Sequence, residues 1–190
     1  FRTRDILMVH GTIDGEHFAV YVAHLPSRAG GKKGGNQLRD RGGEIMYEHA
    51  MKMQEKYPGR LCACFGFVPE LSRKIYAGAD MFLMPSKSEP CGLSQMIASR
   101  YGAIPVVRET GGLYDSIKPY IEHEDGTFEG DGFTFANYNA HDMMYTLRLA
   151  ISLCRDESKR KELVKKIMRR DFSWEVSAVK YLEIYNQLTK

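Results

Sequence analysis

From Asp80 to Leu113 the chain reads DMFLMPSKSEPCGLSQMIASRYGAIPVVRETGGL, and this stretch decides the fold class. Two short apolar runs, MFLMP and IPVVR, stand on either side of CGLSQMIASRYG, which has the pattern of a helix. Strands that alternate with helices predict parallel pairing, and an unbroken apolar run indicates a strand covered on both faces. We therefore expect an α/β fold with a partial Rossmann-like parallel sheet and flanking helices.

The segments before this stretch differ in character. Residues 61–67 (LCACFGF) predict another strand, and residues 69–78 (PELSRKIYAG) predict a helix. Nearer the start, two β-rich runs, Ile6 to His10 and His17 to Ala23, surround a glycine-bearing turn and predict a hairpin. Apolar residues at helical spacing predict a helix from Leu38 to Tyr57. We thus expect a β-hairpin and a helix ahead of the sheet.

The segments after the stretch predict a helical tail. Residues 120–135 are acidic and rich in glycine, which predicts a long loop. Three amphipathic helices are expected beyond it, from Ala140 to Leu153, from Glu157 to Arg170 and from Trp174 to Leu188. Asp156 and Ser173 precede two of these helices, where N-cap residues belong.

The composition of the 190 residues, 43% hydrophobic and 27% charged, is typical of a soluble globular protein. A net charge of +3, with basic and acidic residues spread along the chain, excludes a strong electrostatic footprint for nucleic acid. No apolar run approaches the roughly 18 residues that span a bilayer, and no signal-peptide pattern is present. The four cysteines give no paired CxxC framework. We expect a cytoplasmic chain with reduced thiols, and its start at Phe1 in mid-pattern suggests a fragment.

The loop SKSEP after the first strand is a candidate phosphate-binding site. In open α/β sheets, ligands bind beyond the carboxyl ends of the strands, where loops run into helix N-termini. We expect the helix to begin near Cys91, with Gly92 allowing close approach of a diphosphate. Glu89 is positioned to accept hydrogen bonds from sugar hydroxyls. The alternative, that Glu89 and Ser88 only cap the helix, has about equal weight on spacing alone.

A second loop, ETGGL, follows the strand IPVVR. Its paired glycines, Gly111 and Gly112, permit positive φ and close backbone approach, and Thr110 precedes them. The alternative is an ordinary turn that enters a helix. Because the carboxyl ends of neighbouring parallel strands share one edge, we expect this loop to lie beside SKSEP.

These residues carry a family resemblance. From IYAGADMFLMPSKSEPCGLSQMIASRYG through IPVVRETGGLYDSI, the chain resembles the C-terminal half of the bacterial glycogen and plant-type starch synthases. The resemblance covers about residues 57–190. It implies a GT-B glycosyltransferase architecture and retaining transfer of glucose from ADP-glucose to an α-1,4-glucan, with no metal or cofactor. It also implies ADP-glucose and α-glucan as partners, without a membrane or a specific nucleic acid.

The resemblance also implies roles for individual residues. Glu89 matches the acidic residue that binds the donor glucose, and Tyr76 matches a tyrosine that packs against the adenine. The residues matching the turn that contacts the phosphates are Cys91, Gly92, Leu93 and Ser94. Without the resemblance, Tyr76 is an aromatic core residue on a helix. The family's phosphate-clamping arginine and lysine are not found, because Arg60, Arg73 and Lys87 lie outside its motif, so we expect the chain alone to be inactive.

The first 57 residues resemble a different family. Their strand followed by HLPSR is similar to the endonuclease/exonuclease/phosphatase family, in which the histidine matching His24 helps to bind the scissile phosphate. Arg28 and Asn36 lie in the loop beyond it. The metal-binding glutamate, the GDxN segment and the distal aspartate–histidine pair of that family are not found.

We therefore divide the chain into a nuclease- or phosphatase-like fragment, residues 1–57, and a nucleotide-sugar-binding domain, residues 58–190. Two alternatives to a glycogen synthase fragment stay open: a metal-dependent phosphoesterase fragment and a non-catalytic chimeric module. For the histidines and the Lys32-Lys33 loop of the first part, we favour a solvated hairpin without chemistry.

Overall fold

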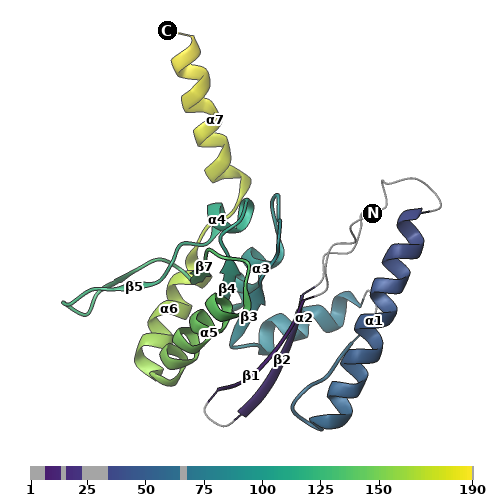
Figure 1. Cartoon of the computed structure of the whole chain (residues 1–190). Coiled ribbons are helices and arrows are strands. Elements are labelled where there is room, and N and C mark those ends of the chain that lie inside the picture. The colour runs from purple at the N-terminus through teal and green to yellow at the C-terminus, as the bar shows by residue number, and fades with distance from the viewer. Residues whose placement is uncertain (1–6, 14–15, 23–33, 65–67, 190) are drawn as a thin grey trace.

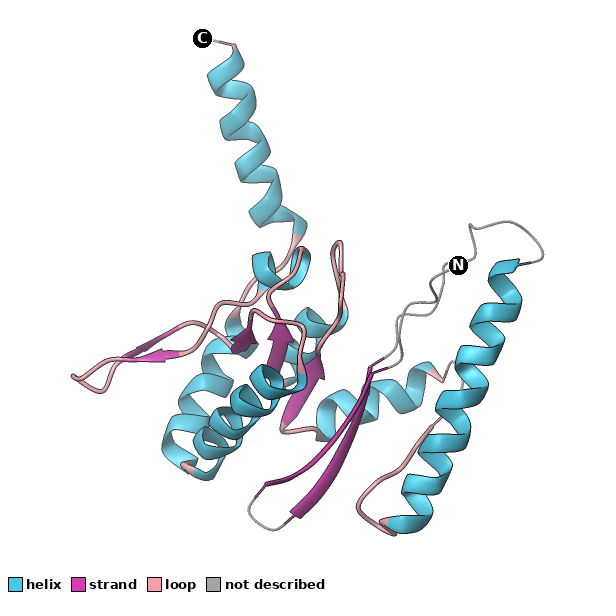
Figure 2. Cartoon of the chain, viewed as in Figure 1, coloured by secondary structure: helices cyan, strands magenta, loops and turns pink. Residues whose placement is uncertain are grey.

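The structure is a computed structural model, and it describes all residues except 1–6, 14–15, 23–33, 65–67 and 190. Its centre is a three-stranded parallel sheet in the order β3-β4-β7 (Figures 1 and 2). Strand β3 spans Met81–Met84, β4 spans Ile104–Arg108 and β7 spans Phe133–Phe135. Met81 pairs with Ile104, and Val106 pairs with Phe133. The predicted α/β fold with a parallel sheet is confirmed.

Strand β7 lies inside the segment for which the sequence predicts only a loop. Residues 120–135 also contain a short antiparallel pair, β5 (Ile121–Glu122) and β6 (Phe128–Glu129). In β7, Phe133 and Phe135 are buried and Thr134 between them is half-buried. This alternation is correct for a strand, but three residues are too few to stand out in sequence. The prediction of a loop throughout this segment is therefore wrong.

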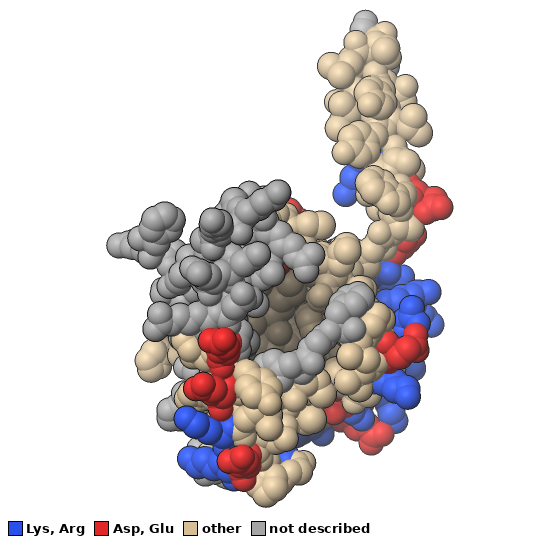
Figure 3. All heavy atoms as spheres, turned by 90° about the vertical axis from the view of Figure 1, so that its right-hand side faces the viewer, with Lys and Arg blue, Asp and Glu red and all other residues tan. Residues whose placement is uncertain are grey.

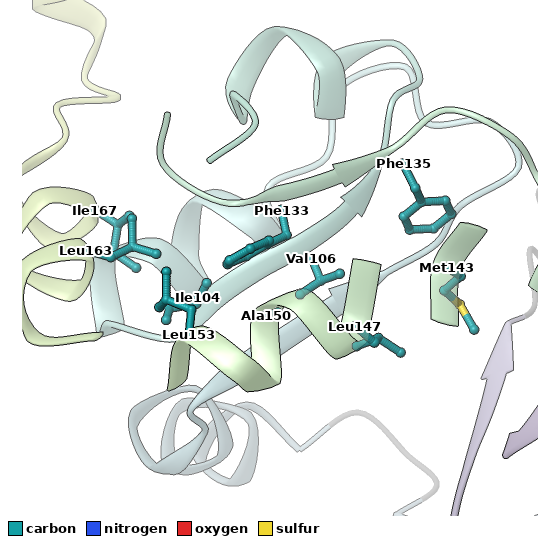
Figure 4. Close-up of a cluster of buried hydrophobic side chains, with 10 residues drawn as sticks. All are labelled: Ile104, Val106, Phe133, Phe135, Met143, Leu147, Ala150, Leu153, Leu163 and Ile167. Carbon is teal, nitrogen blue, oxygen red and sulfur yellow. The ribbon is translucent and has the colours of Figure 1, made fainter. Parts of the chain in front are cut away.

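Helices pack on the sheet as the alternating pattern predicts. Helix α3 (Ser94–Tyr101) connects β3 to β4, α5 (Ala140–Arg155) packs against β7 and β4, and α6 (Glu157–Arg169) packs against α3 and α5. Their shared core is the cluster drawn in Figure 4: Ile104, Val106, Phe133, Phe135, Met143, Leu147, Ala150, Leu153, Leu163 and Ile167. Burying each large apolar side chain of this kind stabilises the fold by about 1.5–3 kcal/mol. A second cluster consists of Val107 from β4, Leu113 from α4 (Gly112–Ser116) and Ile117, which follows that helix.

The predicted strand at residues 61–67 is wrong for its described part, Leu61 to Cys64. The backbone N–H of Leu61 donates to the carbonyl of Tyr57 at 3.3 Å, and that of Ala63 donates to Gln54 Oε1 at 2.9 Å. These bonds tie the segment to the end of α1 (Gly34–Lys56). The N–H groups of Leu61 and Ala63 therefore go to a turn and to a side chain, and not to a neighbouring strand.

The predicted hairpin is confirmed as β1 (Leu7–Ile13) and β2 (Glu16–Val22), which pair antiparallel with Leu7 opposite Val22. Within the described residues these strands pair only with each other and do not extend the parallel sheet. Helix α1 follows, beginning earlier than the predicted Leu38. The candidate His24 and the Lys32-Lys33 loop lie outside the described residues.

Two helices keep no buried residue in the described part of the chain: α2 (Pro69–Gly78) and α7 (Trp174–Leu188). Helix α7 projects from the body, and its surface is mostly uncharged (Figures 1 and 3). The helices predicted at 140–153, 157–170 and 174–188 are thus confirmed as α5, α6 and α7. No helix among the described residues is long and apolar enough to cross a membrane.

Candidate functional site

Two loops meet at the carboxyl edge of the sheet. The first loop, residues 85–93, follows β3, and the second loop, residues 109–111, follows β4 and leads into α4. The backbone N–H of Gly112 donates a 3.1 Å hydrogen bond to the carbonyl of Glu89. The two loops therefore lie side by side, as the strand order predicts.

The paired glycines are what allow this contact. A Cβ on Gly111 would overlap the carbonyl oxygen of Glu89, and one on Gly112 would overlap that of Cys91. Gly111 has φ +47° and is the N-cap of α4, so the turn into a helix is present as well. The two interpretations of this loop therefore describe one structure, and the close backbone approach is the part that requires glycine.

Helix α3 begins at Ser94, later than the predicted Cys91, and its N-cap is Leu93 without a side-chain cap bond. The alternative in which Glu89 and Ser88 cap this helix is therefore wrong. The first bond into the helix runs from the Ile97 N–H to the Leu93 carbonyl at 3.0 Å. The N–H groups of the preceding turn have no acceptor within the helix, and they carry the positive end of its dipole.

Gln95, on α3, joins the first loop to α4, the helix that follows the second loop. Its side chain is fully buried, and its Nε2 donates to the carbonyl of Gly92 at 2.8 Å and to Ser116 Oγ at 2.9 Å. Ser116 Oγ in turn donates to the carbonyl of Gly112 at 2.5 Å. Gly92 itself has φ +72°, which favours glycine. The sequence did not point to Gln95 or Ser116, because a glutamine and a serine on helices carry no distinctive pattern.

Arg108, the last residue of β4, also holds the first loop. Its Nη1 donates to the carbonyl of Lys87 at 2.9 Å, and its Nε donates to the carbonyl of Ala136 at 3.1 Å. The Lys87 ammonium and the Arg108 guanidinium both lie over the ring of Tyr138, at 5.9 and 5.6 Å. Two cations thus stand near the candidate site. The sequence signal that was missed is a charged residue at the carboxyl end of a parallel strand.

The carboxylates of the two loops differ in their partners. Glu109 Oε1 accepts a 2.6 Å hydrogen bond from Thr134 Oγ1 on β7, so this side chain is held against the sheet. Glu89 is half-buried, and its carboxylate has no hydrogen bond or ion pair within the described part of the chain. Of these two carboxylates, that of Glu89 is therefore the one available to a ligand.

The other predicted residues fall into two groups. Cys91 and Leu93 are exposed, and Gly92, Ser94 and Thr110 are half-buried, all at the two loops or the start of α3. Tyr76 is elsewhere: its ring packs 5.5 Å from Phe82 and 6.2 Å from Tyr101, which lie toward the amino end of the strands. These ring contacts fit the packing role of Tyr76, and its role in adenine binding stays a prediction.

No group of three or more histidine, cysteine, aspartate or glutamate side chains in the described residues is placed to hold a metal ion. The charged groups of the candidate site are therefore the helix N-terminus, Lys87, Arg108, Glu89 and Glu109, of which Glu109 is bonded to Thr134. A helix dipole and two nearby cations favour an anion, and a free carboxylate beside them favours hydroxyl groups.

A parallel sheet with flanking helices and loops of this kind is the architecture of one domain of a GT-B glycosyltransferase. A solved structure with this likeness is the catalytic domain of starch synthase IV from Arabidopsis thaliana bound to ADP and acarbose. It is 37% identical with a TM-score of 0.62, and the match covers 80% of this chain and 30% of that one.

Curated relatives identify the family over most of the chain. The glycogen synthase of Geobacillus thermodenitrificans is 54% identical over 139 residues, which is 73% of this chain and 28% of the relative. The glycogen synthase of Fusobacterium nucleatum is 54% identical over 147 residues, which is 77% of this chain and 31% of the relative. This part of the chain is therefore homologous to the glycogen and starch synthases. The chain spans only about 30% of the length of these relatives.

The beginning of the chain has a second likeness. The endonuclease/exonuclease/phosphatase family matches residues 1–60. A match of 149 residues to the glycogen synthase of Bacillus licheniformis does not fit within residues 58–190, so it reaches into α1. The two likenesses thus overlap in α1. Because His24 is not among the described residues, no site geometry supports phosphoesterase chemistry.

Proposed function

We propose that the two loops and the start of α3 bind the donor ADP-glucose in a retaining glucosyl transfer to an α-glucan. The observation that supports this most directly is the 3.1 Å bond between Gly112 and Glu89, which joins both loops beside the N-terminus of α3. The starch synthase that this chain resembles was solved with ADP bound, and ADP is the product that the donor leaves behind.

In this proposal the diphosphate lies at the start of α3, at Cys91, Gly92, Leu93 and Ser94. The unpaired backbone N–H groups of the helix would donate to phosphate oxygens, and the helix dipole would offset charge as it builds on departing ADP. Thr110, Gly111 and Gly112 would form the neighbouring wall. Lys87 and Arg108 add positive charge to the same edge, without a contact to phosphate being implied.

Glu89 has a separate role in the proposal, which is to bind the glucose. A carboxylate accepts hydrogen bonds from hydroxyl groups, and such charged bonds are worth about 1.5–3 kcal/mol each. Because its carboxylate has no partner within the described residues, no internal bond has to break for a sugar to bind. Tyr76 is not included, since its ring packs against Phe82 and Tyr101.

We propose donor binding, and not turnover, as the function of this chain by itself. The chain spans about 30% of the length of a glycogen synthase. The loss of one charge-stabilising group typically lowers a rate by roughly two to three orders of magnitude. A cytoplasmic location and a glucan acceptor bound by further parts of a complete synthase belong to the same proposal.

Calorimetric titration with ADP and with ADP-glucose tests the proposal on the wild-type chain and on Glu89→Gln. Because Glu89 is assigned to the sugar, the substitution is expected to weaken ADP-glucose by roughly ten- to a hundredfold and to leave ADP nearly unchanged. The matched control is Glu129→Gln, an exposed glutamate on β6. Absence of ADP binding to the folded wild-type chain would refute the site, and equal loss for both ligands would refute the role of Glu89.

A further inference from the structure

Two cysteines outside the candidate site lie in contact. Cys62 and Cys64 are both exposed, and their Sγ atoms are 3.8 Å apart. They belong to the segment in which the sequence predicted a strand. Neither residue takes part in the proposed donor site, so their arrangement requires a separate account.

Backbone hydrogen bonds hold the residues before and between the two cysteines. The N–H groups of Arg60 and Leu61 donate to the carbonyl of Tyr57 at 3.1 and 3.3 Å. Ala63, which stands between the cysteines, donates its N–H to Gln54 Oε1 at 2.9 Å. The turn before Cys62 and the residue between the two cysteines are thus both tied to the end of α1, which places the two thiols together.

The separation of the two sulfur atoms fits a single cation that is bound by both. In a tetrahedral thiolate complex with metal–sulfur bonds of about 2.3 Å, two sulfur ligands lie about 3.8 Å apart. A disulfide would instead require the atoms to approach to about 2.05 Å. Thiolates are soft ligands and select soft cations over Mg²⁺ or Ca²⁺. The observed distance therefore matches chelation with little movement of either side chain.

There is also room beside Cys62. A cavity of about 500 Å³ is lined by Gln54, Glu55, Pro58, Gly59, Arg60, Leu61 and Cys62. An ion held by two sulfur atoms keeps further coordination positions, and an open cavity lets water or a small added ligand occupy them. Among the described residues no third cysteine, histidine or carboxylate completes a ligand set.

We propose that Cys62 and Cys64 form a two-thiolate site for a soft divalent cation of the Zn²⁺ and Cd²⁺ class. One aqueous cation replaces two thiol protons, two metal–sulfur bonds form, and two protons are released to solvent. Water fills the other positions. The site is independent of the donor site, since it uses none of its residues.

The test is a titration of the reduced full chain with Cd²⁺, followed by its ultraviolet thiolate-to-cadmium charge-transfer absorption. This absorption reports sulfur ligands and is blind to histidine. We expect one Cd²⁺ per chain, with Zn²⁺ competing for the site only when it is in excess, because Cd²⁺ is the softer cation. Cys62→Ser and Cys64→Ser should each raise the dissociation constant at least about tenfold, since a lost ligand costs no less than a lost supporting contact. Cys91→Ser, which removes an exposed thiol of the donor site, should leave the dissociation constant for Cd²⁺ unchanged.

Three results would overturn the site. The first is an absorption that survives when both Cys62 and Cys64 are serine. The second is equal loss in Cys91→Ser. The third is one Cd²⁺ per two chains on a dimer, which would mean four thiolates shared between copies. Far-ultraviolet circular dichroism on each variant confirms that the exposed serines leave the fold intact.

Discussion

The carbonyl of Glu89 accepts a hydrogen bond from the N–H of Gly112, 3.1 Å away, so the residue proposed to bind the sugar is fixed through its backbone. Its side chain remains free within the described residues. The second loop therefore positions the first. This arrangement makes the glycines of the second loop part of the geometry of Glu89, although neither glycine has a side chain to offer a ligand.

Gly112→Ala is expected to disturb both the fold and the site. Its new Cβ would overlap the carbonyl of Cys91, so the loops must separate. We expect a loss of about 1–3 kcal/mol in the free energy of unfolding, as for other overpacked positions. ADP binding should weaken by roughly tenfold, or about 1.4 kcal/mol. Denaturant titration and calorimetry measure the two effects.

Gly78→Ala is the matched control for that substitution. Gly78 is the last residue of α2, and nothing lies within 4 Å of the position of its Cβ. Alanine in a helix is favoured over glycine by up to about 1 kcal/mol, so this variant should be neutral or slightly more stable. Equal destabilisation by the two substitutions would contradict the argument from close approach.

How much of this could be predicted from sequence depends on the kind of residue. The order of strand, loop and helix around Glu89 follows from apolar runs and glycines, which are local signals. The bonds made by Gln95 and Arg108 depend on which segments the fold brings together, and they join positions far apart in the chain. Local sequence patterns carry no information about such partners. The hydrogen bonds that Gln95 and Arg108 make to the site could therefore not be predicted from the sequence.

The dependence on contacts between distant segments also explains the two errors in the predicted fold. Residues 61–64 have the apolar composition of a strand. The N–H of Ala63, however, donates its hydrogen bond to the side chain of Gln54 on α1 and not to a neighbouring strand. Strand β7 has only three residues, and its identity comes from its pairing with β4. In both places tertiary contacts, and not local preference, decide the conformation.

Gln95→Met tests the role of the buried side-chain amide of Gln95, which is bonded to both Gly92 and Ser116. Methionine has a similar volume but offers no donor to the carbonyl of Gly92 or to Ser116 Oγ. Leaving buried acceptors without a partner costs about 1–3 kcal/mol, and we expect that loss in thermal or denaturant unfolding. Gln187→Met, at an exposed position on α7, supplies the control. If both variants unfold alike, the amide does not hold the loops.

Asp156→Ala tests the cap of α6. Asp156 Oδ1 accepts hydrogen bonds from the N–H groups of Ser158 and Lys159, both at 3.1 Å. Loss of such a cap typically costs about 1 kcal/mol, and Asp156→Ser should recover most of it. Ser173→Ala is the comparison, because Ser173 occupies an N-cap position without a side-chain cap bond. We expect that change to stay within about 0.5 kcal/mol.

The last prediction concerns Cys154, which is half-buried beside the core. Burial raises the pKa of the Cys154 thiol above its ordinary value, and the nearby Asp80 carboxylate raises it further. A raised pKa leaves less thiolate at any given pH, and the thiolate is the reactive form. At pH 8, iodoacetamide should therefore modify Cys154 more slowly than the exposed Cys91, as peptide mass mapping over time would measure. The difference should disappear when the chain is unfolded in guanidinium chloride, and if it persists there, the folded environment is not its cause.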